Sequence, residues 1–102
     1  MSVVVVATVF PQPGHREEVI AAYTETVAKV HAEDGCELYA LNQAEDRLMM
    51  IEKWASREAL RAHSQGAPLA ELRSRLAGKI TGPAEVIVLE AVPAGDPGKG
   101  RL

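Results

Sequence analysis

The sequence lacks several features that would assign it to a particular compartment. It has one cysteine, Cys36, so no intramolecular disulfide can form, and a reducing compartment is expected. No apolar run approaches the roughly 20 residues of a membrane span. The N-terminal run Met-Ser-Val-Val-Val-Val has no basic region before it and no small-residue cleavage site after it, so we interpret it as a strand and not as a signal peptide. These absences favour a cytoplasmic location.

Clusters of like charge are also missing. The formal net charge is -3, the isoelectric point is about 5.6, and the lysine and arginine side chains do not gather in one segment. We therefore expect neither a nucleic-acid partner nor a membrane partner. A length of 102 residues with 47% hydrophobic and 25% charged residues is typical of one globular domain. A domain this small buries a modest share of its surface, so a partner subunit would help to stabilise it.

The hydrophobic pattern alternates between the periods of strands and helices. β-Branched residues and period-two alternation indicate strands, whereas apolar residues three and four apart indicate helices, and proline or glycine separates the segments. In chain order the pattern predicts a strand at 3–10, a helix at 15–32, strands at 36–43 and 48–55, a short helix after Ser56, a second helical segment from Pro68, and a strand at 85–92.

This order predicts an α+β, ferredoxin-like βαββαβ domain over residues 1–92 with a four-stranded antiparallel sheet. Two helical stretches cover one face of such a sheet, yet both sets of alternating strand positions are apolar. By alternation we group Val4, Val6, Leu48, Met50, Ile87 and Leu89 on one face, and Val3, Val5, Val9, Leu41, Met49, Ile51, Val86 and Val88 on the other. A second copy packed face to face would cover the free face, so we expect a homodimer formed through the sheet faces.

Residues 93–102 form a tail rich in proline and glycine with no hydrophobic period. Such a segment has little reason to order by itself. We expect it to lie across the neighbouring subunit, since the apolar Leu102 otherwise has no evident use.

Three groups of residues stand in an order typical of one known family. An E-x-G-C-x-x-Y run enters the second strand, and E-x-W closes the third strand. An S-x-x-A-L-x-x-H segment then follows. The residues that carry this pattern are Glu33, Gly35, Cys36, Tyr39, Glu52, Trp54, Ser56, Ala59, Leu60 and His63. Over residues 2 to 92 the chain resembles the antibiotic biosynthesis monooxygenase (ABM) domain.

The resemblance implies a dimeric α+β barrel with a ligand cavity between the helices and the sheet. Family members oxygenate aromatic polyketides or quinols with molecular oxygen, without metal, haem or flavin, so we expect no cofactor. Haem-degrading relatives carry an Asn, a Trp and a ligating His where this chain has Thr8, His63 and Arg73. Polyketide oxygenases carry an Asn four residues before the Trp of the third strand; here that residue is Met50, and only Trp54 matches.

His63 is the candidate catalytic residue. Its predicted place on the short helix puts it near the mouth of the implied cavity. Histidine is the side chain that changes protonation state near neutral pH, so it could take a proton from a phenol or hydroquinone. The resulting anion can pass an electron to oxygen without a cofactor. The alternative is a half-exposed helix residue that bonds to the backbone.

Five residues are candidates for binding the substrate. Trp54 could stack on a flat aromatic molecule or could be a packing anchor, and Tyr23 could line the cavity from the first helix. Thr8 could offer a hydroxyl, and Met50 shares a strand face with Glu52 and Trp54. Glu52 would be buried there. It would either pair with Arg73 or Lys79, or have a raised pKa and act as a base.

We therefore predict a cofactor-independent monooxygenase that acts on a planar phenolic, quinol or polyketide-like small molecule with molecular oxygen. Two alternatives remain open. One is a non-catalytic, ligand-binding or stress-associated module of the same fold. The other is an isomerase of a small phosphorylated metabolite, which would need a basic cavity with Arg73 or Lys79 directed into it.

Overall fold

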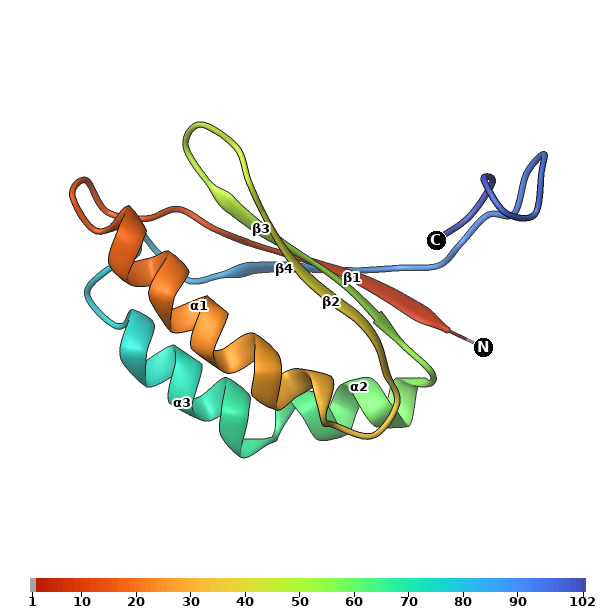
Figure 1. Ribbon diagram of the computed structural model, residues 1–102, viewed down its shortest axis with the longest axis horizontal. Coiled ribbons are helices and arrows are strands. Elements are labelled where there is room, and N and C mark those ends of the chain that lie inside the picture. Colours follow the sequence, from red (N-terminus) through yellow and green to blue (C-terminus); the bar gives the residue numbers. More distant parts are fainter. Residues whose placement is uncertain (1) are drawn as a thin grey trace.

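The computed structural model describes residues 2–102 and shows three helices on one side of a four-stranded sheet (Figure 1). The elements in chain order are β1 (Val3–Val9), α1 (Arg16–His31), β2 (Cys36–Gln43), β3 (Leu48–Trp54), α2 (Arg57–Ser64), α3 (Ala67–Leu76) and β4 (Glu85–Leu89). The sheet is antiparallel with the strand order β2-β3-β1-β4.

The predicted fold class is confirmed, with the broken helical stretch resolved into two helices. The order is therefore βαββααβ. Ser56 caps α2 as predicted, its hydroxyl accepting a hydrogen bond from the Ala59 backbone N–H at 3.1 Å. Pro68 lies in the first turn of α3, where its missing N–H costs no helical hydrogen bond. β4 ends at Leu89, three residues earlier than predicted, and residues 90–102 contain neither helix nor strand.

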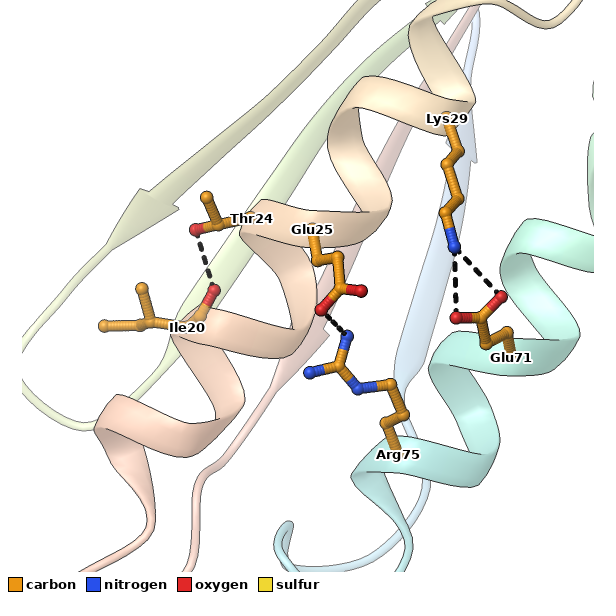
Figure 2. Close-up of polar contacts among 6 residues, drawn as sticks. All are labelled: Ile20, Thr24, Glu25, Lys29, Glu71 and Arg75. Carbon is orange, nitrogen blue, oxygen red and sulfur yellow. Dashed lines mark hydrogen bonds and ion pairs between the residues drawn. The ribbon is translucent and has the colours of Figure 1, made fainter.

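Helices α1 and α3 lie side by side and are joined by two ion pairs (Figure 2). The Lys29 ammonium lies 3.1 Å from the Glu71 carboxylate. The Arg75 guanidinium lies 2.7 Å from the Glu25 carboxylate. All four side chains are partly or largely exposed, so each pair contributes at most about 1 kcal/mol. The main stabilisation comes from the apolar residues beneath the helices, which contact the sheet.

The register of the strands decides which residues face the helices. Val5 lies opposite Glu52, Ala7 opposite Met50 and Val9 opposite Leu48, so these residues share the helix-covered face. Our grouping of Val4 and Val6 with Leu48 and Met50 was therefore wrong. Alternation fixes the two faces within one strand, but the relation between strands depends on the pairing register.

The core lies between the helices and this covered face of the sheet. Its buried members are Val5, Val9, Val19, Ala22, Tyr23, Val30, Tyr39, Leu48, Met50, Trp54, Leu72 and Leu76. No helix of residues 2–102 covers the opposite face, and β4 is exposed along its whole length. Among the helices of this described part, none is both long enough and apolar enough to cross a membrane.

Candidate functional site

Five side chains from four segments of the chain meet under α2, at one end of the core. Glu52 and Trp54 come from β3, Tyr39 from β2, His63 from α2, and Glu33 from the turn that follows α1. Tyr39, Glu52, Trp54 and His63 are each buried, and Glu33 is half-buried. We call these five residues the His63 cluster.

The imidazole of His63 is held on three sides. Its Nδ1 atom lies 2.8 Å from Glu33 Oε1, a hydrogen-bond distance, whereas its Nε2 atom lies 3.9 Å from Glu52 Oε1, which is too long for a hydrogen bond. The ring stacks on Trp54 with centroids 4.5 Å apart, and Tyr39 meets it edge-on at 5.4 Å. His63 is only 4% exposed and its Nδ1 contacts a side chain, so the alternative of a half-exposed residue that bonds to the backbone was wrong.

Glu52 is a buried carboxyl group with one direct donor. Trp54 donates its indole N–H to Glu52 Oε1 at 2.9 Å, as two residues on one strand face can do. Neither predicted cation reaches it, because Lys79 pairs with Glu18 and Arg73 lies exposed on α3. Burial therefore raises the pKa of Glu52; the indole hydrogen bond and His63 oppose this rise, and the nearby Glu33 adds to it.

This raised pKa gives the protein a defined pH dependence. A carboxyl group that holds its proton more tightly in the folded state favours folding below its ordinary pKa of 4.5, and this advantage is lost as the pH rises through the folded value. We expect Glu52→Gln, which keeps an acceptor for the Trp54 N–H, to gain stability relative to the wild type as the pH rises from 4 towards neutrality. Urea unfolding at several pH values measures the difference, and a difference that moves the other way would contradict the prediction.

Two tyrosines lie close to this carboxyl group. Burial, with a further contribution from the charge of Glu52, raises the pKa of Tyr23 to about 12. The same two causes raise the pKa of Tyr39. Both hydroxyl groups therefore remain protonated near neutral pH and can act as hydrogen-bond donors, but not as bases.

The structure brings together most of the predicted site residues. His63, Trp54, Glu52, Met50 and Tyr23 all lie on the helix-covered side of the sheet. Thr8 does not join them. It lies opposite Met49 and Glu85 on the uncovered face, so its predicted place in the same cavity was wrong. The reason is again the register, which a single strand does not reveal.

The sequence reasoning missed Glu33. It was named as the first residue of the E-x-G-C-x-x-Y run and was given no role, yet it makes the shortest polar contact of His63. The E-x-G-C-x-x-Y run could have pointed to Glu33, because it also contains Tyr39, a second residue that contacts His63. That run does not reveal that its partner lies 30 residues later in the chain.

The His63 cluster does not line the cavity of about 430 Å³ that opens between the C-terminal tail and the start of α2. That cavity is bordered by Val4, Lys53, Arg57, Glu90 and Arg101 among other residues. Within residues 2–102 no group of three or more His, Cys, Asp or Glu side chains is arranged to hold a metal ion. The side chains of the cluster can transfer protons through His63 and Glu52, and can form hydrogen bonds through Trp54 and Tyr39.

The fold and this cluster define a class: a ferredoxin-like α+β domain with a carboxylate–imidazole–indole cluster under its helices. The sequence pattern that defines the antibiotic biosynthesis monooxygenase family matches residues 2–75. Because the match spans well over half of the chain, the protein belongs to the ABM family. The resemblance read from the E-x-G-C-x-x-Y and E-x-W segments is thus confirmed.

Solved structures show the same fold. Rv0793 from Mycobacterium tuberculosis superimposes with a TM-score of 0.85 and 28% sequence identity, over 94% of this chain and 100% of that chain. A candidate antibiotic biosynthesis monooxygenase from Caulobacter crescentus CB15 has a TM-score of 0.82 and 26% identity, over 89% of this chain and 90% of that one. None of the curated proteins matches the sequence.

Proposed function

We propose that the protein is a cofactor-independent monooxygenase that oxidises a planar phenolic, quinol or polyketide-like molecule with molecular oxygen, and that His63 is its proton acceptor. One observation carries the proposal. Nδ1 of His63 is engaged by Glu33, while Nε2 has no carboxylate within hydrogen-bond distance in the described chain and can accept a proton. Membership of the ABM family supports the reaction class.

The chemistry balances with oxygen as the only other reactant. His63 takes the hydroxyl proton, and the phenolate passes one electron to O₂, which gives superoxide and an organic radical. Their combination forms a carbon–oxygen bond and, with the proton returned, a hydroperoxide. The carbon that carries the hydroperoxide then loses its hydrogen as a proton while the oxygen–oxygen bond breaks. The departing hydroxide and this proton together form water. One oxygen atom ends in a new carbonyl group and the other in water.

The neighbours of His63 suit a flat aromatic substrate. Trp54 already stacks on the imidazole, and an incoming ring could take a similar position against either surface. The adjoining space would be shaped by Met50, Glu52 and Tyr23. The Tyr23 hydroxyl would donate a hydrogen bond to the substrate. Since His63 is buried, substrate entry requires α2 to move. α2 is suited to this, because it has eight residues and His63 is its only fully buried side chain.

The test is oxygen consumption by metal-free protein with a panel of hydroquinones and anthrones. We expect His63→Ala to lower the rate by a factor of about 10² to 10⁴, which is typical for loss of a general base. His15→Ala is the matched control, because His15 is exposed and contacts Glu18 at the start of α1. Uptake that does not depend on His63 would reject the assigned base, and no uptake above the uncatalysed rate would favour the ligand-binding alternative.

The two alternatives are supported unequally. The isomerase requires Arg73 or Lys79 directed towards the His63 cluster, but Arg73 is exposed on α3 and Lys79 pairs with Glu18. A module without turnover is supported by the near-complete burial of the cluster, since a packed cluster stabilises the fold whether or not it acts on a substrate.

We also propose that two copies of the chain pack through their uncovered sheet faces, with the tail of each lying across the other. Ile87 is 58% exposed on that face, Leu89 and Leu38 lie on it as well, and the tail extends away from the body of its own chain (Figure 1). The face carries Lys53 at one end and Glu85 at the other. A two-fold axis across the strands would bring these opposite charges together.

A pair of substitutions on β4 tests the dimer. Ile87 and Val86 are 58% and 60% exposed but point to opposite faces of the strand. We expect Ile87→Glu to produce monomers in analytical ultracentrifugation and Val86→Glu to leave the dimer largely intact. A wild-type monomer would reject the proposal, and a dimer unaffected by removal of residues 93–102 would reject the role of the tail.

A further inference from the structure

We propose that Glu33 is the positioning residue of His63: it fixes the imidazole in the tautomer with its proton on Nδ1, so that Nε2 is the free basic atom. The catalytic meaning of this arrangement rests on the proposed function. The assignment of the tautomer does not rest on the proposed function, and the tautomer can be measured without a substrate.

The first support is the geometry around the ring. A carboxylate only accepts hydrogen bonds, so the 2.8 Å contact between Glu33 Oε1 and Nδ1 requires a proton on Nδ1. In a neutral imidazole the other nitrogen then carries a lone pair. The groups that face the ring from the remaining elements are Trp54, Tyr39 and Glu52. Of these, Trp54 donates its N–H to Glu52, and Glu52 Oε1 lies 3.9 Å from Nε2. None of these contacts competes with Glu33 for Nδ1.

The second support is the way the turn that carries Glu33 is held against α2. Gly35 accepts a hydrogen bond at its carbonyl from the Ala55 backbone N–H at 2.8 Å. Gly35 also packs so closely that a Cβ atom on it would lie 2.5 Å from the Cβ of Ala59. Ala59 and His63 are four residues apart on α2 and so share one face of the helix. The close packing of Gly35 on Ala59 therefore also fixes the distance between Glu33 and His63.

The third support is the state of the second carboxylate oxygen. Glu33 Oε2 is buried and has no hydrogen-bond partner in the described part of the chain. Burying such an oxygen opposes folding, so stability alone does not favour a carboxylate at this position. A carboxylate is, however, the group that specifies an Nδ1 proton most strongly.

The experiment is nitrogen-15 NMR of the histidine side chains in the full-length, substrate-free protein, at a pH where imidazole is neutral. We expect His63 of the wild type to show a protonated Nδ1 and an unprotonated Nε2. Glu33→Ala should remove this preference, and Glu33→Asp, which keeps the charge but is one methylene too short, should weaken it. Glu37→Ala is the control, because Glu37 is exposed on β2 and bonds to Ser2. If Glu33→Ala does not fold, Glu33→Asp supplies the comparison.

The outcomes separate this proposal from the oxygenase proposal. A proton on Nε2 in the wild type, or a tautomer unchanged in both Glu33 variants, would overturn the positioning role. An Nδ1 proton that depends on Glu33, in a protein that consumes no oxygen, would support the positioning role while rejecting the oxygenase. If oxygen is consumed, we expect Glu33→Ala to lower kcat much more than it changes KM, since the base is misplaced while the substrate contacts remain.

Discussion

Replacing Gly35 with alanine should lower the free energy of unfolding by about 3 kcal/mol. Gly35 has a φ of +79°, a left-handed conformation that costs a residue with a side chain about 1–2 kcal/mol. The added methyl group would also collide with Ala59, and overpacking of this kind costs about 1–3 kcal/mol. Urea unfolding followed by circular dichroism measures the loss.

Gly14 provides a matched control for this substitution. Its φ is +83°, but nothing lies within 4 Å of the position where a Cβ would stand. Gly14→Ala should therefore cost only the backbone part, about 1–2 kcal/mol. Ala59→Gly should recover part of the additional loss when combined with Gly35→Ala, because it removes the colliding atom. Equal losses at Gly14 and Gly35 would show that the close approach to α2 contributes nothing.

Trp54→Ala should be comparably severe, with a loss of about 3–5 kcal/mol. The side chain is fully buried, so its removal leaves a cavity beneath α2 that neighbouring residues only partly fill. It also supports the imidazole of His63 and donates the hydrogen bond to Glu52. A small domain has about 5–15 kcal/mol of stability in total, so this variant should lie near the limit of folding.

Trp54→Phe separates the packing role from the hydrogen-bonding role. It keeps much of the ring volume but removes the N–H that Glu52 accepts, so the unpaired carboxyl group should destabilise the fold, and its pKa should rise further. In a Glu52→Gln background the same substitution should cost less, because no buried charge is left without its donor. Equal costs in the two backgrounds, measured by urea unfolding at neutral pH, would show that the indole acts through packing alone.

Much of the local structure could be predicted from the sequence. β2 begins at Cys36 and ends at Gln43 as predicted, and α1 differs from its predicted bounds by one residue at each end. These boundaries follow from short-range causes, such as the turn from Glu33 to Cys36 that contains the left-handed Gly35, and the hydroxyl cap at Ser56. β4 is the exception: the apolar pattern continued to Val92, but pairing with β1 ends at Leu89, opposite Val4.

The candidate site was predicted only in part. Trp54 and Glu52 could be grouped because they are two residues apart on one strand, and alternation alone places them on one face. Their contact with His63 could not be derived, because it depends on how α2 folds back over the sheet. Nor could the sequence exclude an ion pair between Glu52 and Arg73 or Lys79, since the direction of α3 determines where those side chains lie.

The sequence by itself determined the elements, their order, the family and the excess of apolar strand surface, because each depends on neighbouring residues or on composition. Only the tertiary structure decided that Thr8 faces away from His63, that Glu52 is buried with no lysine or arginine partner among residues 2–102, and that Glu33 contacts the imidazole. The physical reason is range. Backbone preferences and periodicity act over a few residues, whereas strand register and helix packing are set by the simultaneous fit of segments far apart in the chain.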